Sequence, residues 1–495
     1  GKIKELDHIN RTLILRKGIS KEAKQLPKTL SISEKVMEHS RFDNLNKNIY
    51  SFCENILENK EGYKALKSFL NRDLPNINGI DPGQRIIKSE SFDKEIPDII
   101  SRLNSSYVYL QGAPGTGKTY YSANAIVELL KKNKRIAVTA NSHKVIHNLL
   151  HKVEEIAMEK NFIFKGLKMG NPDNEDTFFN GNQIKTEKNE RQYIEGLKKR
   201  DILLYSGTKY HLAQWYYKKE IDYLFLEEAS QLSLADLIGI GNVAKNIVII
   251  GDQNQLGTVV QGSHPGASGL SVLEYLLEGK ETVEENRGIF LNRTFRMHPH
   301  INKFISDTFY ESKLLTHPKN KNRKIDFPKN FFIQKEGLHT ILMNHENCKQ
   351  TSEEEFKKID EIIKKLIGRK FTDADNKVRP LKISDFLIVS PYNAQVKFLL
   401  ARLPKGIRIG TVDSIQGSEA PVAITSMTSS DLESLPRNKS FFFNKNRLNV
   451  SVSRAQCLSI IIFNQKLLEI PPLTHEEFKL INNFQKLLKY KINTD

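Results

Sequence analysis

Cysteine is scarce in this sequence: there are three among 495 residues, Cys53, Cys348 and Cys457, and no Cys-x-x-Cys pair occurs. Such scattered cysteines argue against a disulfide framework, a zinc site and an iron–sulfur cluster, and they are typical of a reducing, cytoplasmic compartment. The sequence also lacks an uninterrupted apolar run of membrane-spanning length and an apolar first segment of the signal-peptide kind. We therefore expect a cytoplasmic protein with no membrane segment.

The charge is unbalanced toward basic residues. There are 75 Lys and Arg residues against 58 Asp and Glu, which gives a formal net charge of +17. A basic excess favours a polyanionic partner, and nucleic acid is the commonest one. Because basic residues can also simply keep a surface solvated, composition alone leaves both interpretations open.

One glycine-rich stretch, residues 112–119 (GAPGTGKT), organises the rest of the chain. It follows an apolar run and precedes an amphipathic one, which is the strand–loop–helix context that the phosphate-binding motif G-x-x-x-x-G-K-[ST] requires. Glycines let backbone N–H groups converge on one anion, and the new helix adds its dipole. Lys118 can then reach the β- and γ-phosphates, and the Thr119 hydroxyl can ligate Mg²⁺. The predicted nucleoside-triphosphate contacts are Gly112, Pro114, Gly115, Thr116, Gly117, Lys118 and Thr119.

Short apolar strands alternate with helical stretches in two series. The first series has candidate strands at 107–111, 135–140, 201–206, 223–226 and 247–250, and the second at 289–291, 340–343, 386–390, 407–410, 422–426 and 459–463. Strands of this kind, separated by helices, predict parallel sheets covered on both faces. Because only the first series contains a phosphate loop, we expect an α/β protein with two similar parallel-sheet lobes and one nucleotide between them.

These patterns divide the chain into four parts. Residues 1–95 are rich in Lys and Asn and predict a helical N-terminal region, or a linker from an upstream domain. The first lobe is expected over 96–288, with a polar insertion or mobile subdomain around 161–200. The second lobe is expected over 289–470, and 471–495 is expected to form a closing helix.

Polar residues follow two strands of the first series. Glu227 and Glu228 come after the strand at 223–226, where a parallel-sheet phosphate site holds Mg²⁺ and a water-activating base. Glu227 would hold the metal through water, and Glu228 would polarise the attacking water. An acidic pair can also simply begin a helix, but the phosphate loop favours the functional interpretation. Gln255, beyond the strand at 247–250, can contact either the γ-phosphate or that water.

The order of motifs resembles that of the superfamily 1 helicases, most closely the Upf-like branch of subgroup B, whose members move 5′→3′ on single strands. Some stretches are closer still to bacterial members fused behind a RecB-like nuclease domain, so a nuclease domain or subunit is an expected partner. The resemblance implies two RecA-like lobes of the P-loop NTPase fold. It rests on residues 112–119, 139–143, 227–230, 251–256, 291–299, 410–419 and 446–455.

The resemblance also assigns roles to individual residues. Arg296 and Arg454 correspond to two arginine fingers, whose planar guanidinium can bind two γ-phosphate oxygens at once. Gln416 and Glu419 correspond to residues that link the nucleotide to the nucleic-acid track, and Glu419 is also a predicted nucleotide contact. For Tyr392, stacking on a base and packing within the protein are both open. The predicted nucleic-acid contacts are Asn141, Ser142, His143, Thr208, Tyr392 and Thr411.

The sequence departs from the family pattern at Glu227, where Asp is usual, and at Phe295, where Tyr is common. The resulting hypothesis is an ATP- and Mg²⁺-dependent 5′→3′ helicase or translocase on single-stranded nucleic acid, with DNA favoured. The alternatives are a nucleotide-gated clamp that does not unwind its substrate and a helicase that acts on RNA.

Overall fold

The computed structural model describes residues 2–7, 12–16, 40–89, 91–218, 220–257, 266–415, 417–430, 442–472 and 474–492, so Gln416 lies outside the described residues. The chain divides into two units, 1–43 and 44–495. The expected helical character of residues 1–95 is confirmed for α1 (Ser40–Leu57) and α2 (Lys64–Leu70). The region also contains β1 (Lys2–Asp7) and β2 (Thr12–Arg16), which pair as an antiparallel hairpin that the sequence patterns did not predict. Their Ile and Thr residues favour strands over helices.

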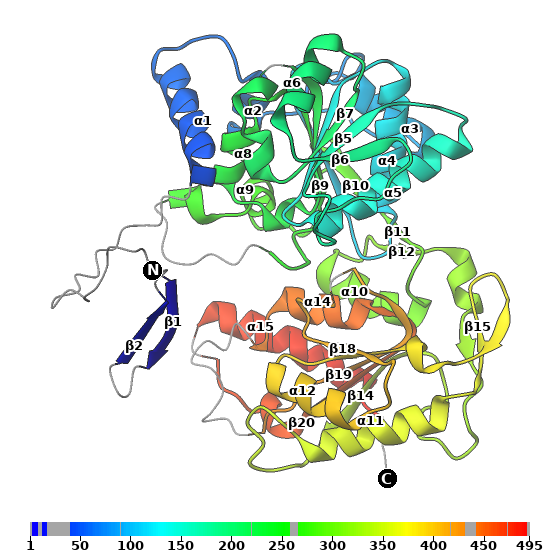
Figure 1. Cartoon of the computed structure of the whole chain (residues 1–495). Coiled ribbons are helices and arrows are strands. Elements are labelled where there is room, and N and C mark those ends of the chain that lie inside the picture. The colour runs from blue at the N-terminus through cyan, green and yellow to red at the C-terminus, as the bar shows by residue number, and fades with distance from the viewer. Residues whose placement is uncertain are drawn as a thin grey trace. The chain divides into compact units, whose positions relative to one another are not determined.

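The first of two large parallel sheets defines what we call the first lobe. Its eight strands lie in the order β10-β3-β9-β8-β4-β7-β5-β6, and every neighbouring pair is parallel (Figure 1). The strands are β3 (Tyr107–Gly112), β4 (Ile136–Thr139), β5 (Gly166–Met169), β6 (Ile184–Glu187), β7 (Leu204–Ser206), β8 (Ile221–Leu226), β9 (Ala244–Gly251) and β10 (Gly288–Leu291).

Helices cover both faces of this sheet because successive side chains of a buried strand point to opposite sides. In β3, Val108 and Leu110 enter one apolar cluster, whereas Tyr107 and Tyr109 enter the other. The first cluster is formed with α3 (Phe92–Ser101), α4 (Lys118–Lys131) and α5 (His143–Glu159). The second is formed with α1, α2, α6 (Glu190–Lys199), α7 (Lys209–Leu212), α8 (Leu234–Ile240) and α9 (Val272–Leu277).

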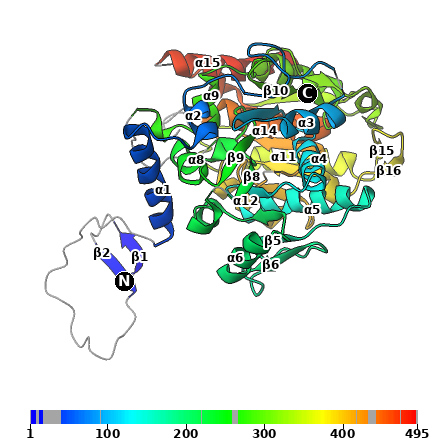
Figure 2. The ribbon, with the colours of Figure 1, turned by 90° about the horizontal axis from the view of Figure 1, so that it is seen from above.

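Two expectations about the first lobe are wrong. The strand expected at 289–291 does not open the second lobe, because β10 pairs with β3 at the edge of the first sheet. The segment 161–200 is not a separate subdomain, because β5 and β6 extend the sheet beyond β7 and α6 lies beside them (Figure 2). Its polar composition is that of a sheet edge, where short strands with few buried residues suffice.

The second large sheet defines the second lobe. Its five strands lie in the order β14-β20-β19-β17-β18 and are all parallel, as expected. They are β14 (Gly337–Met343), β17 (Phe386–Val389), β18 (Arg408–Gly410), β19 (Ala420–Ser426) and β20 (Ala455–Asn464). The helices are α10 (Pro299–Phe309), α11 (Glu353–Leu366), α12 (Asn393–Arg402), α14 (Lys445–Ser453) and α15 (His475–Gln485), the last being the expected closing helix.

Two small sheets accompany this lobe. The short strands β11 (Arg293–Thr294) and β12 (Leu315–Thr316) pair in parallel, and an antiparallel sheet is formed by β13 (Lys324–Ile325), β15 (Lys370–Thr372) and β16 (Val378–Pro380). Within the part of the chain that the structure describes, no helix is both long and apolar enough to cross a bilayer.

Candidate nucleotide site

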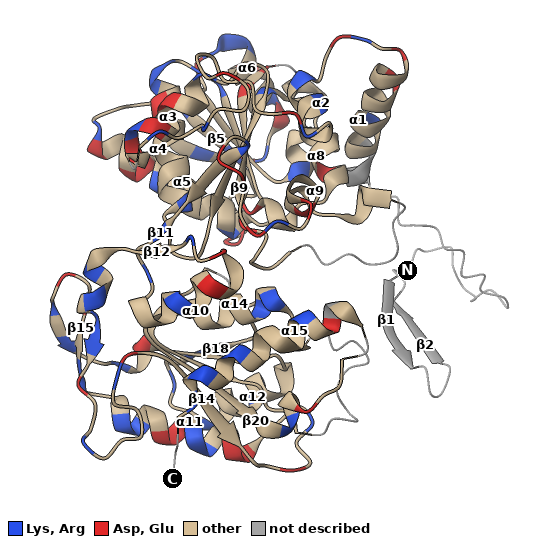
Figure 3. Cartoon of the chain, turned by 180° about the vertical axis from the view of Figure 1, so that it is seen from behind, with Lys and Arg blue, Asp and Glu red and all other residues tan. Residues whose placement is uncertain are grey.

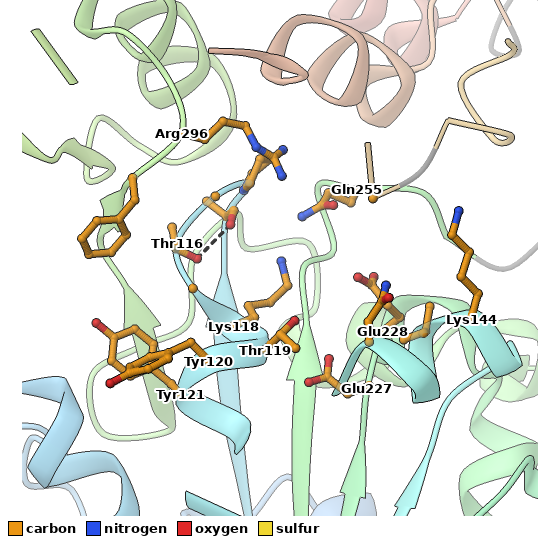
Figure 4. A pocket seen from close by; sticks show the side chains of 18 of the residues that line it. Thr116, Lys118, Thr119, Tyr120, Tyr121, Lys144, Glu227, Glu228, Gln255 and Arg296 are labelled. Carbon is orange, nitrogen blue, oxygen red and sulfur yellow. Dashed lines mark hydrogen bonds between the residues drawn. The ribbon is translucent and has the colours of Figure 1, made fainter. Parts of the chain in front are cut away.

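The glycine-rich loop has the conformation that the phosphate-binding motif predicts. It leaves the end of β3 and enters α4 at Lys118, with Gly117 in the left-handed region at φ 83°. The loop is held by its own contacts, since the Thr116 hydroxyl donates to the Ala113 carbonyl oxygen at 2.8 Å (Figure 4). The Lys118 Nζ lies 2.5 Å from the Gly112 carbonyl oxygen. The lysine thus stays over the loop, at the first turn of a 14-residue helix whose N-terminus favours anions.

A cavity of about 950 Å³ opens above this loop. Its lining includes Lys118, Thr119 and the two acidic residues of the first lobe, and also Arg296 and Arg454, which precede or follow helices of the second lobe. The structure therefore brings charged groups from both halves of the chain to one pocket. Its volume lies within the range of small-molecule sites. Of the predicted nucleotide contacts, Pro114, Gly115, Thr116, Gly117, Lys118 and Thr119 line the cavity.

The acidic pair stands at the carboxyl end of β8 and faces the loop (Figure 4). Glu227 is 3% exposed, and burial, together with the neighbouring Glu228, raises its pKa to about 7, although Lys118 opposes this. One carboxylate oxygen of each residue is buried without a hydrogen-bond partner. Glu228 also has a positive φ of 51°, which is uncommon outside glycine and marks a strained position of the kind found at functional sites.

The two arginines reach the cavity from the second lobe. Arg454 is 3% exposed, its Nη1 donates to the Ser418 carbonyl oxygen at 3.2 Å, and its Nε is buried without a partner. Burial and the nearby Arg296 lower the pKa of Arg454 to about 9, so its guanidinium remains charged at pH 7. Two close cations with few anionic partners make a strong local positive field, which suits a terminal phosphate.

Glu419 does not line the cavity but holds one of these arginines. Its carboxylate accepts from Arg296 Nε at 2.5 Å and from Gln456 Nε2 at 2.8 Å. Burial would raise the pKa of Glu419, but Arg296 and the hydrogen bond from Gln456 bring it below its ordinary value. This residue is predicted from the sequence as a nucleotide contact. The structure instead places it behind Arg296, where it orients the guanidinium.

Comparisons with known proteins agree with this geometry. Two family models, each described as an AAA domain, match residues 97–261 and 269–466. The chain is 26% identical over 415 residues to the DNA polymerase alpha-associated DNA helicase A of Schizosaccharomyces pombe, which covers 70% of this chain and 59% of the relative. It is 24% identical over 410 residues to the DNA replication ATP-dependent helicase/nuclease dna2 of that yeast, and the match covers 76% of this chain and 28% of the relative. It is 25% identical over 464 residues to the ATP-dependent helicase upf1 of the same yeast, and the match covers 82% of this chain and 48% of the relative.

The chain carries two AAA domains and is similar to superfamily 1 helicases of the Upf1-like, DNA2-type branch. The prediction of an α/β fold with two parallel-sheet lobes, one of which carries the phosphate loop, is confirmed. The chain spans 59%, 28% and 48% of the length of the three relatives named above.

Gln255 joins a buried network between the lobes. Its Nε2 donates to Asp252 Oδ2 at 2.8 Å, and the same oxygen accepts from the Tyr310 hydroxyl at 2.6 Å. Asn449 of α14 donates to that Tyr310 oxygen at 2.9 Å and to the Asn254 carbonyl oxygen at 2.7 Å. Because Asp252 is fully buried and its partners come from both lobes, a movement of one lobe must disturb the anchor of Gln255.

The predicted nucleic-acid contacts follow the carboxyl ends of neighbouring strands. Asn141, Ser142 and His143 follow β4, and Thr208 follows β7, which pairs with β4. In the second lobe, Tyr392 follows β17 and Thr411 follows its neighbour β18. Ligands bind at this edge of open α/β sheets, so the positions are compatible with one track along both lobes.

Two of these residues, Ser142 and Tyr392, have structural roles. The Ser142 hydroxyl caps α5 by accepting from the Val145 amide at 3.3 Å, and Ser142 also lines the nucleotide cavity. Tyr392 is 9% exposed and packs in the apolar core of the second lobe, with its ring centroid 6.3 Å from that of Phe442. Between the two interpretations that the sequence left open for Tyr392, the structure supports packing.

Several residues that line the cavity have no role assigned to them from the sequence. Tyr120 and Tyr121 follow the phosphate loop directly, and Lys144 lies in the first turn of α5, on the same side of the cavity as Glu228 (Figure 4). Asp413 and Ser414 contribute from the second lobe. Tyr120 and Tyr121 lie next to the phosphate loop in sequence, and Asp413 and Ser414 lie within residues 410–419, but only the folded chain shows that they face the cavity.

A glycine of the phosphate loop is predicted to set the position of the Arg296 segment. A Cβ atom on Gly115 would lie 2.4 Å from Arg296 Cβ and 2.9 Å from Thr294 Oγ1. We expect Gly115→Ala to displace Arg296 and to lower the rate of ATP hydrolysis about 10²-fold, since a shift of about 1 Å has that effect on a positioned catalytic group. The rate is measured by phosphate release in the presence of single-stranded nucleic acid.

Gly279→Ala is the matched control. Gly279 has a similar positive φ, 84° against 74°, but no atom lies within 4 Å of its hypothetical Cβ. Both variants therefore carry the same kind of backbone strain, and only one carries the clash. Equal hydrolysis rates in the two variants would contradict the assigned role of this contact.

Proposed function

We propose that this chain is an ATP-driven helicase or translocase that moves 5′→3′ on single-stranded nucleic acid, with DNA as the preferred substrate. One observation carries the proposal: Lys118, Glu228 and Gln255 of the first lobe line the same cavity as Arg296 and Arg454 of the second. A nucleotide held in this cavity would touch both lobes. Its hydrolysis would therefore change how the lobes are held together, which is the requirement for a motor.

The chemical step needs four contributions from the chain. Lys118 and the amides of the phosphate loop bind the β- and γ-phosphates. Glu228 accepts a proton from the attacking water, whose oxygen bonds to the γ-phosphorus while the bond from that phosphorus to the bridging oxygen breaks and ADP leaves. Arg296 and Arg454 stabilise the charge on the equatorial oxygens. Gln255, held by Asp252, orients the water or the γ-phosphate.

The residues of the acidic pair also fit a magnesium ion. The orphaned, buried oxygen of Glu227 and the Thr119 hydroxyl at the start of α4 are hard oxygen donors at the edge of the cavity. When bound, Mg²⁺ neutralises phosphate charge and orients the phosphate oxygens. Glu227 replaces the usual Asp, and its longer side chain would hold the ion through a water molecule.

The nucleic-acid track is proposed to follow Asn141, His143, Thr208 and Thr411 along the strand ends of both lobes. Among the residues that the structure describes, Lys and Arg occur in both lobes and stand beside Asp and Glu along helices such as α11 (Figure 3), so their positions along the ribbon do not by themselves mark the path. The assignment therefore rests on the strand ends. There, polar side chains, backbone amides and helix N-termini can hold phosphates without reading sequence.

A strand-displacement assay tests the proposal. Duplexes with a 5′ or a 3′ single-stranded overhang, in matched DNA and RNA versions, are incubated with ATP and Mg²⁺ at a stated salt concentration, because phosphate contacts make affinity salt-dependent. We expect displacement only from the 5′ overhang and faster displacement of DNA. Lys118→Ala is the inactive control.

The alternatives correspond to other outcomes. Nucleic-acid-stimulated ATP turnover without displacement from either overhang would favour a nucleotide-gated clamp. Faster displacement of the RNA duplex would favour an RNA helicase. A nuclease domain or subunit as partner stays a prediction, and the relative described as helicase/nuclease dna2 is consistent with it.

A further inference from the structure

A group of side chains that could hold a metal ion lies in the second lobe, in the loop between β14 and α11 and in the first turn of α11. One donor atom from each of His345, Cys348 and Glu354 lies within 4.8 Å of the other two. Among the residues that the structure describes, this is the one group of three His, Cys, Asp or Glu side chains that converges so closely. None of the three belongs to the nucleotide cavity.

The chain prepares His345 to act as a ligand. Its side chain is fully buried, and its Nε2 lies 3.2 Å from Glu355 Oε1. The Glu355 carboxylate also accepts from the Thr428 amide at 2.9 Å and the Ser426 hydroxyl at 2.5 Å. Because a carboxylate only accepts, Nε2 carries the proton and Nδ1 keeps its lone pair.

The Nδ1 of His345 is buried and has no hydrogen-bond partner. A buried nitrogen with a free lone pair needs an explanation, because nearly all such atoms are paired. A metal ion provides one, since ligating histidines commonly donate their other ring nitrogen to a carboxylate, as His345 does to Glu355.

The other two donors are at the spacing of a metal site. Cys348 Sγ lies 3.7 Å from Glu354 Oε2. With Zn–S near 2.3 Å and Zn–O near 2.1 Å, a tetrahedral ion would set these atoms about 3.6 Å apart. The backbone holds both in place: Asn347 turns the chain at φ 56°, and the Cys348 amide donates to Ser430 Oγ at 3.0 Å. Glu354 stands in the first turn of α11, which Ser352 caps.

We propose that His345, Cys348 and Glu354 form a binding site for zinc, with water as the fourth ligand. An imidazole with a thiolate selects zinc over magnesium or calcium, which prefer oxygen alone. Cysteine spacing in the sequence argued against a zinc site, but that argument considers only pairs of cysteines. The ion would hold this loop in place. The loop is already linked to the end of β19 by the hydrogen bond from Ser426 to Glu355, and to α12 by the hydrogen bond from the Ser352 amide to Gln395.

Zinc binding by the full chain tests the proposal, in nucleotide-free buffer so that the nucleotide site does not contribute. We expect about one tightly bound zinc per chain by elemental analysis. Cys348 is partly exposed and Glu354 is exposed, so substitutions there should not disturb the core. Cys348→Ser and Glu354→Gln should each weaken zinc binding about 100-fold or more, which exceeds the effect of changing a residue that contacts only a metal ligand. Cys53→Ser, which removes an exposed cysteine elsewhere, should leave it unchanged.

Alkylation followed by mass spectrometry tests the site without substituting any residue. Zinc should protect Cys348 from a maleimide and leave exposed Cys53 reactive, and a chelator should remove the protection. Co²⁺ in place of zinc should give a thiolate-to-metal absorption that Cys348→Ser abolishes. Absence of bound zinc, zinc content that neither variant changes, or alkylation of Cys348 that zinc does not slow would each overturn the proposal.

Discussion

Replacing Arg454 with lysine is expected to slow nucleic-acid-stimulated ATP hydrolysis about 10³-fold, the lower end of the effect of an arginine finger in phosphoryl transfer. The side chain is almost fully buried at the cavity, where Nε has no partner and Nη1 has only the Ser418 carbonyl oxygen. Lysine keeps a positive charge but loses the planar fork that binds two phosphate oxygens. Turnover is measured by phosphate release at saturating ATP.

The same environment predicts how the lysine variant responds to pH. Burial and Arg296 lower the pKa of Arg454 to about 9. Because this value is above neutral pH, the arginine stays charged there. The ordinary pKa of lysine is near 10.4, which is lower than that of arginine. An equal lowering at this site would therefore bring the pKa of the lysine ammonium close to neutral pH. The deficit of Arg454→Lys relative to the parent chain should therefore grow as pH rises from 6 to 8.

Arg379→Lys is the matched control for this substitution. Arg379 also makes charged hydrogen bonds, to both oxygens of Asp385 at 2.5 and 2.8 Å, but it lies outside the nucleotide cavity. It should hydrolyse ATP close to the parent rate. If Arg454→Lys also retained nearly full activity at pH 7, the arginine would not be a finger.

Replacing Glu228 with glutamine is expected to lower the hydrolysis rate by about 10²–10⁴-fold, the contribution of a positioned general base. Glutamine has nearly the same shape but cannot accept the proton of the attacking water. Glu228 faces the cavity with a buried, unpartnered oxygen and a strained backbone, so its position is fixed by the fold and not by its own hydrogen bonds. ATP affinity should be kept or increased, because a negative charge near the phosphates is removed.

Glu220→Gln separates this effect from a general loss of charge. Glu220 is paired with Arg135 at 2.9 Å, away from the nucleotide cavity, and its substitution should leave turnover unchanged. Binding of a fluorescent ATP analogue and single-turnover hydrolysis distinguish loss of binding from loss of chemistry. Normal turnover in Glu228→Gln would remove this residue from the mechanism.

The core of the nucleotide site could be predicted from sequence because its parts are local. The phosphate loop, the acidic pair and Gln255 each follow a buried strand directly, and parallel strands bring their carboxyl ends to one edge of the sheet. The two arginines were found only through the order of motifs. No local pattern indicates that Arg296 and Arg454 face a lysine that lies far away in sequence.

Other features depended on side-chain placement. Periodicity could not assign β10 to the first sheet, because a short apolar run fits an edge of either sheet. Glu419 and Tyr392 belong to recognisable motifs, yet the first holds Arg296 from behind and the second packs in the core. Motif position predicts that a residue lies near a site, whereas contact with the ligand depends on neighbours from other elements.

The sequence by itself determined that this chain forms two parallel α/β sheets and that one of them carries a phosphate loop, because strand and helix periodicity and the glycine spacing are local properties. Only the tertiary structure decided which charged groups meet. It joined the two lobes through Asp252, Tyr310 and Asn449, and it brought His345, Cys348 and Glu354 together beside a buried Glu355. The physical reason is that burial and pairing depend on the packing of segments distant in sequence, which no local pattern encodes.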